Sequence, residues 1–130
     1  MAALSDYSEK LILDYLMTTG SATRPTNWYV ALYTAAPSDS GGGTELSGSG
    51  YGREAVTFAA ATSGAGTTSN SGAVVFTADG GDWGSVTHMG IHDATSSGNL
   101  LWHGALAAAK TVLDGDSLEF AVGNIDLTVA

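Results

Sequence analysis

The chain has 130 residues, enough for one domain that buries roughly two thirds of its unfolded surface. Its formal net charge is −9, and its four scattered basic residues cannot form a nucleic-acid-binding surface. It has no cysteine, which excludes disulfides and thiolate metal sites, and no signal-like leader or apolar run of ~20 residues, so we expect no membrane partner.

The first predicted element is a helix within residues 1–20. Asp6 as N-cap and Glu9 three residues later form a capping-box pattern, and Gly20 offers a C-terminal stop. Large side chains recur at four-residue spacing along one face: Tyr7, Leu11 and Tyr15. This spacing predicts a helix with an apolar face.

After Pro25 the hydrophobic period changes from 3.6 to 2, which predicts a strand over residues 28–33. One side of this strand carries Trp28, Val30 and Leu32, and the other carries Tyr29, Ala31 and Tyr33. Because both sides are apolar or aromatic, we expect the strand to be covered on both faces.

Six further short strands are predicted between turn signals such as "ATSSGN", "LDGDS" and "VGN". They cover residues 54–60, 73–77, 85–93, 100–106, 117–122 and 125–130. The regular spacing predicts a mainly β fold. We expect a single domain over residues 1–130: one N-terminal α-helix, then an antiparallel β-sandwich of about seven strands over 26–130.

The loop "GGGTELSGSGYGRE" resembles a phosphate-binding loop only in its glycine content. It has no lysine, leads into a strand and lacks the G-x-G-x-x-G spacing of dinucleotide sites. The sequence therefore predicts a structural surface loop, either mobile or ordered against a neighbouring subunit, with glycine allowing close backbone approach.

Metal binding by the histidines is disfavoured by their spacing. His88 and His92 share one strand face but lie about 13 Å apart in an extended chain, and His103 on the next strand does not correct this separation.

Catalytic and calcium-binding patterns are incomplete as well. Asp114-Gly115 is predicted to form a hairpin turn, and Asp79 and Asp82 lie in a Gly-Gly turn rather than a paired acid–base site. No G-x-S-x-G elbow occurs. We therefore predict no catalytic residues, no metal and no cofactor, and a protein that is not an enzyme.

The aromatic residues allow two interpretations. A carbohydrate platform and a role in the core or in subunit contacts both suit Trp and Tyr, and the second is the commoner role. The residues concerned are Trp28, Tyr29, Tyr33, Trp83 and Trp102.

Four stretches resemble a family of small virion structural proteins of tailed bacteriophages, often labelled tail-fibre-like. They are "LDYLMTTG", "NWYVALYTAAPSDSGGGTELSGSGYGREAVTF", "WGSVTHMGIHDATSSGNLLWHGAL" and "KTVLDGDSLEFAVGNIDLTV". The resemblance covers nearly the whole chain and carries no catalytic motif. It implies a virion component assembled in the host cytoplasm, bound to other virion proteins, and it leaves head and tail open.

Between these locations we expect a capsid decoration, or cement, protein, because a short domain without repeats suits a surface clamp. We also expect a homo-oligomer, with a trimer as the favoured form. The alternative is a tail or tail-fibre component that could serve as a host receptor-binding module. The predicted contact residues lie on the helix face and in the glycine-rich loop: Tyr7, Leu11, Tyr15, Gly41, Gly42, Gly43, Tyr51 and Arg53.

Overall fold

The computed structural model describes residues 2–62 and 64–129, and it is mainly β with one helix near the N-terminus. This confirms the predicted fold class. The elements in chain order are β1 (Ala2–Leu4), α1 (Asp6–Met17), β2 (Tyr29–Ala35), β3 (Thr44–Glu45), β4 (Glu54–Ala55), β5 (Thr67–Ser69), β6 (Val74–Thr77), β7 (Gly84–His92), β8 (Leu100–Val112), β9 (Ser117–Phe120) and β10 (Asp126–Thr128).

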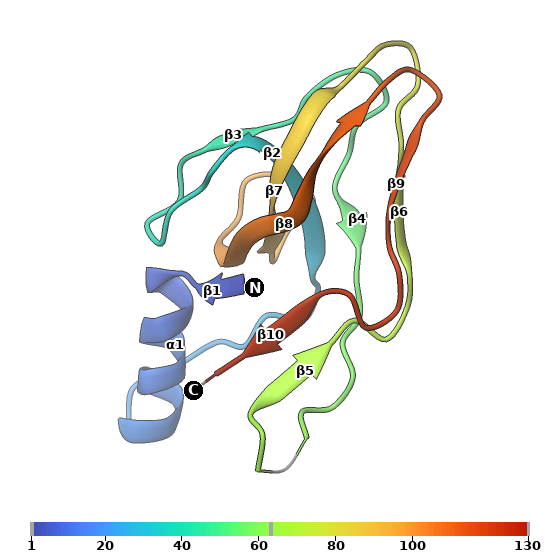
Figure 1. Ribbon diagram of the computed structural model, residues 1–130. Helices are drawn as coiled ribbons and strands as arrows, with labels where there is room; N and C mark the ends of the chain where they lie inside the picture. The colour runs from blue at the N-terminus through green and yellow to red at the C-terminus, as the bar shows by residue number, and fades with distance from the viewer. Residues whose placement is uncertain (1, 63, 130) are drawn as a thin grey trace.

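Six strands form the main antiparallel sheet in the order β1-β8-β7-β2-β3, with β4 also paired to β2 (Figure 1). At its centre β2 and β7 pair in unbroken register from Tyr29 opposite His92 to Tyr33 opposite His88. The remaining strands form two separate antiparallel pairs, β5 with β10 and β6 with β9.

The core lies between the main sheet and the two small pairs. Val30 and Leu32 of β2 are fully buried there together with Phe76 of β6. The fold is thus layered like the predicted sandwich, but its second layer is divided into two pairs. On the other face of β2, Ala31 and Tyr33 are buried too, which confirms that this strand is covered twice.

The seven predicted strands are all present, most of them shorter than expected, and β1, β3 and β5 are short strands that the sequence did not indicate. The strand predicted over residues 100–106 continues to Val112 through a register shift, because His88 pairs with Ala105 whereas Val86 pairs with Lys110. The pairing of β8 with β7 is therefore irregular between Ala105 and Lys110.

The turn at Asp114-Gly115 exists, but the predicted hairpin is wrong. Gly115 has a φ of 86°, which a glycine adopts without strain, and Asp116 N donates to Leu113 O. The strand after this turn pairs with β6, not with β8. The turn therefore carries the chain from the main sheet into the second layer.

Both predicted ends of the helix are corrected by one to three residues. Ser5, not Asp6, is the N-cap, because its Oγ accepts a hydrogen bond from Ser8 N. The last helical residue is Met17, and Thr18 in extended conformation ends the helix before Gly20. Ser5 is buried because it also bonds to β8, where its N donates to Leu101 O and its Oγ donates to Leu100 O.

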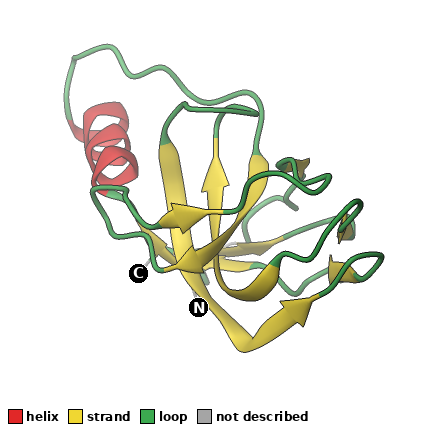
Figure 2. Cartoon of the chain, turned by 90° about the horizontal axis from the view of Figure 1, so that it is seen from above, coloured by secondary structure: helices red, strands yellow, loops and turns green. Residues whose placement is uncertain are grey.

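The helix lies at one side of the strands (Figure 2). It contacts β8 and β1, and Ser8 is the one residue of α1 that is fully buried. The N-terminal end of α1 is thus fixed to the sheet through Ser5, whereas the C-terminal half extends beyond it (Figure 1).

A buried amide joins the two small strand pairs. Asn70 Nδ2 donates to Gly72 O and to Ala121 O, and Ile125 N donates to Asn70 Oδ1, each at 2.9 Å. We expect Asn70→Ala to lower the free energy of unfolding by about 2 kcal/mol, because these backbone groups lose their partners while buried.

Chemical denaturation measures this loss. Asn124→Ala is the matched control, since the Asn124 side chain is exposed and should cost little. Equal denaturation midpoints for Asn70→Ala and the unsubstituted chain would contradict the role given to Asn70.

Candidate functional site

The glycine-rich loop folds back onto its own domain. Gly43 lies so close to Pro37 N that a Cβ atom would come within 2.7 Å of it. Farther along, Tyr51 stacks on Phe76 and meets Trp83 edge-on, with ring centroids 6.3 and 5.7 Å apart. The close approach that the glycines allow is therefore to the chain itself.

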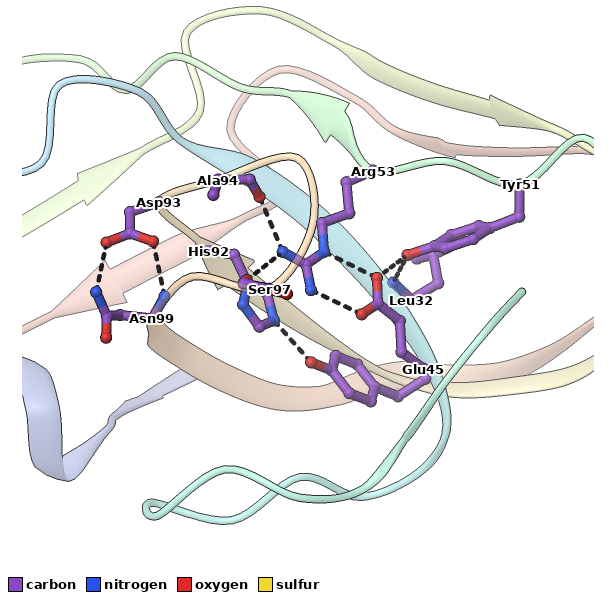
Figure 3. A network of polar contacts seen from close by, with 10 residues as sticks. Leu32, Glu45, Tyr51, Arg53, His92, Asp93, Ala94, Ser97 and Asn99 are labelled. Atoms are coloured by element: carbon purple, nitrogen blue, oxygen red, sulfur yellow. Dashed lines mark hydrogen bonds and ion pairs between the residues drawn. The ribbon is translucent and has the colours of Figure 1, made fainter. Parts of the chain in front are cut away.

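Arg53 is the centre of a polar network that joins its own loop to strand β3 and to the loop after β7 (Figure 3). Its Nε and NH2 groups donate to the two carboxylate oxygens of Glu45 at 2.9 and 2.8 Å. Its NH1 group donates to the carbonyls of Ala94 and Ser97 at 2.8 and 2.9 Å. The Arg53 side chain is only 7% exposed, and its hydrogen bonds are made within the domain.

The carboxylate of Glu45 is stabilised in its charged form. Burial alone would raise the pKa of Glu45, but hydrogen bonds from Arg53 and from Tyr51 Oη outweigh burial and lower it. Leu32 N in turn donates to Tyr51 Oη at 3.1 Å. The network thus runs from the central strand β2 through Tyr51 and Glu45 to Arg53.

A second buried contact lies beside this network. Tyr33 Oη and His92 Nε2 are 2.7 Å apart, and the two rings stack with centroids 6.3 Å apart. Burial, and next the nearby Arg53 cation, lower the pKa of His92 to about 4. With this pKa the His92 ring is uncharged at neutral pH, and its Nδ1 is buried and has no hydrogen-bond partner among the described residues.

Over this network lies an open hollow of about 550 Å³, between the start of α1, the glycine-rich loop and the loop after β7. Four predicted contact residues line it: Tyr7, Gly41, Gly42 and Arg53. The structure brings these four together although they are far apart in the sequence.

Leu11 and Tyr15 line a different surface, an apolar groove of about 250 Å³ between α1 and the chain that returns from it. Leu16, Ala22 and Arg24 also line this groove. The two remaining predicted contact residues, Gly43 and Tyr51, lie in neither hollow and pack within the domain. Contact of any of these residues with another protein stays a prediction.

The exposed side chains on the C-terminal half of α1 extend well beyond the predicted face. Leu13, Leu16 and Met17 are 60%, 68% and 76% exposed, and Tyr15 is 69% exposed. Sequence reasoning missed Leu13 and Met17 because it followed a single four-residue spacing. The run "LILDYLM", in which Asp14 is the one charged residue, was the available signal.

The histidines and acidic residues have separate partners. His103 Nε2 lies 2.7 Å from Asp39 Oδ1, and Asp82 accepts a hydrogen bond from the backbone N of Asp114. Over the described ranges 2–62 and 64–129, no three side chains of the metal-ligating types form one group. Among the described residues, no helix combines the length and the apolar character needed to cross a membrane.

Most of the predicted aromatic residues pack within the domain. Trp83 and Tyr33 are buried, and Trp28 and Trp102 are partly buried against the core, where they line a hollow of about 290 Å³ with Phe58. Four of the five predicted aromatic residues thus have a structural role.

These features define a small, mainly β domain with an internally paired polar network and an exposed apolar helix. The family described as Podophage GP4 fiber I protein gp80 matches residues 3–128. Because this match spans nearly the whole chain, the protein belongs to that family, and it is a structural component of a bacteriophage virion. The predicted resemblance is confirmed. No curated protein matches the chain.

Proposed function

We propose that this protein is a fibre subunit of the phage virion and acts by assembly, not by catalysis. The match to a fibre protein family over residues 3–128 carries the proposal. The bonding of polar side chains to one another within the domain supports this proposal. Arg53 donates two hydrogen bonds to Glu45, and Tyr33 Oη forms a hydrogen bond with His92 Nε2. The chemistry-bearing groups at the centre of the domain therefore hold loops in place.

The attachment surface in this proposal is the C-terminal half of α1. A monomeric soluble domain rarely exposes several large apolar side chains side by side, and such patches typically mark interaction sites. Partner proteins in the virion would cover this patch during assembly in the host cytoplasm.

Fractionated phage particles test the location. We expect an epitope-tagged copy of this protein to leave with the tails and fibres when heads and tails are separated, at a copy number far below that of the capsid subunit. An immunoblot of each fraction gives the distribution. Untagged phage, with antibody against the protein, controls for an effect of the tag.

Capsid decoration is the second candidate, favoured by the single short domain, which has no long repeat for a fibre shaft. In that case hundreds of copies remain on tail-less heads, and the fibre proposal is wrong. A host receptor-binding role predicts a third result, selective binding of the isolated protein to a host glycan or surface protein.

A further inference from the structure

Two tryptophans lie at the margin of the core. Ile91 of β7 pairs with Val30 on one side and with Trp102 of β8 on the other, and residues directly opposite one another in antiparallel strands share a face of the sheet. Trp102 therefore points toward the second layer, as Val30 does. Trp28 comes just before β2 and packs against the same core. Both tryptophans are only partly buried, so part of each ring is in contact with solvent.

An open hollow of about 290 Å³ lies between these tryptophans and the small strand pair β5–β10. Each strand of this pair has three residues, and its directly opposed residues Thr68 and Leu127 form part of the wall. Three aromatic rings form another part, and we call the hollow the tryptophan slot after them: Trp28, Phe58 and Trp102.

The residues of the tryptophan slot define the ligand by charge and by size. None of the described residues that line it carries a charge, so it suits a neutral ligand. Aromatic walls with a few polar groups are typical of small-molecule sites, and the volume is at the lower limit of such sites. The slot therefore has room for a single ring.

The indole N–H groups of the slot have no partner within the described chain. Trp83 Nε1 donates to Ser49 O, whereas Trp28 and Trp102 donate to none of the described residues. Over residues 2–62 and 64–129, the one buried side-chain nitrogen or oxygen without a partner is His92 Nδ1, so both indole N–H groups reach solvent. A ligand that covers them has to accept hydrogen bonds, because a donor that is buried without an acceptor destabilises the complex.

This requirement separates the ligand classes that aromatic hollows bind. A quaternary ammonium ion is attracted to aromatic faces but accepts no hydrogen bond. An aliphatic side chain of another protein would leave both indole groups unpaired. A proline-rich peptide offers carbonyl acceptors, but it needs a groove several residues long. A sugar ring has C–H groups that pack on aromatic faces and hydroxyl oxygens that accept hydrogen bonds, so it meets every condition.

We propose that the tryptophan slot binds one neutral sugar ring, the terminal residue of a glycan chain. Trp28 and Trp102 donate hydrogen bonds to its hydroxyl groups, and the aromatic rings pack on its C–H groups. Thr68 Oγ1, which donates to Ala59 O, keeps lone pairs that accept from a sugar hydroxyl. This binding activity goes beyond the proposed role in assembly. The described residues that line the slot include none from α1, so the site does not depend on where the protein is attached.

Indole signals in proton–nitrogen NMR spectra of the full chain test the proposal, because the chain has three tryptophans. The probes are methyl glycosides of neutral hexoses and of N-acetylhexosamines, each added up to roughly 50 mM. With at least one of them, the Trp28 and Trp102 signals should shift saturably, whereas the Trp83 signal stays in place. We expect a Kd on the order of 1 mM, as is usual for a ligand of this size.

Two variants remove one donor each and retain an aromatic ring. Trp28→Phe and Trp102→Phe should each raise the Kd for the same glycoside at least about fivefold, since each loses one hydrogen bond. Tyr15→Phe is the matched control, because it removes the polar group of an aromatic residue that is 69% exposed and lies outside the slot. Its Kd should be unchanged, and unchanged backbone signals in the same spectra establish that each variant is folded.

Four results would overturn the proposal. The first is the absence of a saturable indole shift with every glycoside. The second is a shift with choline chloride or with N-acetyl-leucine amide in place of the glycosides, which would assign the slot to a cation or to a protein side chain. The third is an unchanged Kd in both tryptophan variants, which would place the site elsewhere. The last is a failure to bind disaccharides that carry the bound sugar at the non-reducing end. None of these results bears on the particle fractionation that tests the fibre role.

Discussion

Replacing Arg53 with methionine should lower the free energy of unfolding by about 3 kcal/mol, because the substitution removes one partner of a largely buried ion pair. Glu45 then loses both of its bonds to the guanidinium, and the carbonyls of Ala94 and Ser97 lose their donor. Methionine retains most of the apolar volume of the arginine side chain, so the loss reports on the polar contacts.

Urea denaturation of three variants separates these effects. Arg53→Met combined with Glu45→Gln should be more stable than Arg53→Met alone, because the uncompensated carboxylate is gone. Lys10→Met is the control ion-pair variant: the Lys10–Asp14 pair is exposed and should contribute no more than about 0.5 kcal/mol. If Arg53→Met denatures at the same urea concentration as the unsubstituted protein, the network does not stabilise the fold.

Acidification should destabilise the protein through His92 before most carboxylates are protonated. Its pKa is lowered to about 4 in the folded state by burial, and an unfolded histidine titrates near 6.5. As the pH falls below about 6.5, the unfolded chain binds a proton that the folded chain does not. Stability is therefore complete above that pH and decreases by up to roughly 3 kcal/mol by pH 4.

The groups around His92 determine the pH range in which the change in unfolding free energy reports on His92. Arg53 and Tyr33 stay protonated throughout, and the lowered pKa of Glu45 removes stability only toward the acidic end, as Glu45 becomes protonated. Between pH 6.5 and 4.5 the slope of unfolding free energy against pH thus reports mainly on His92. His92→Gln should remove most of this slope and His88→Gln should retain it. Equal slopes for His92→Gln and the unsubstituted chain would show that His92 titrates normally.

The sequence predicted β2 well because its evidence is local. Alternation along residues 28–33 placed apolar side chains on both sides, and Ala31 and Leu32 are indeed fully buried on opposite faces. The predicted N-cap of the helix was wrong by one residue because Ser5 and Asp6 are both good N-cap residues. What selects Ser5 is its pair of hydrogen bonds to β8, almost one hundred residues away.

The polar network could not be predicted for the same reason. The partners of Arg53 lie at residues 45, 94 and 97, and only the pairing of β2 with both β4 and β7 brings the last two to the glycine-rich loop. For this reason, the sequence analysis predicted that Arg53 contacts another protein. Its position next to Gly52 in a loop, with few other cations in the chain, was the available clue to a structural role.

The short attachment of α1 has a mechanical consequence. β1 joins the sheet through only three residue pairs with β8, and Ser5 adds the bonds that anchor the helix start. A partner that grips α1 and pulls would place tension on this attachment, whereas β2 and β7 lie deep in the domain. Once β1 and Ser5 detach, residues 18–28, which contain no helix or strand, still tether the helix to β2. Fully stretched, this tether spans roughly 35 Å, so the domain can yield by extension at its edge while its core stays folded.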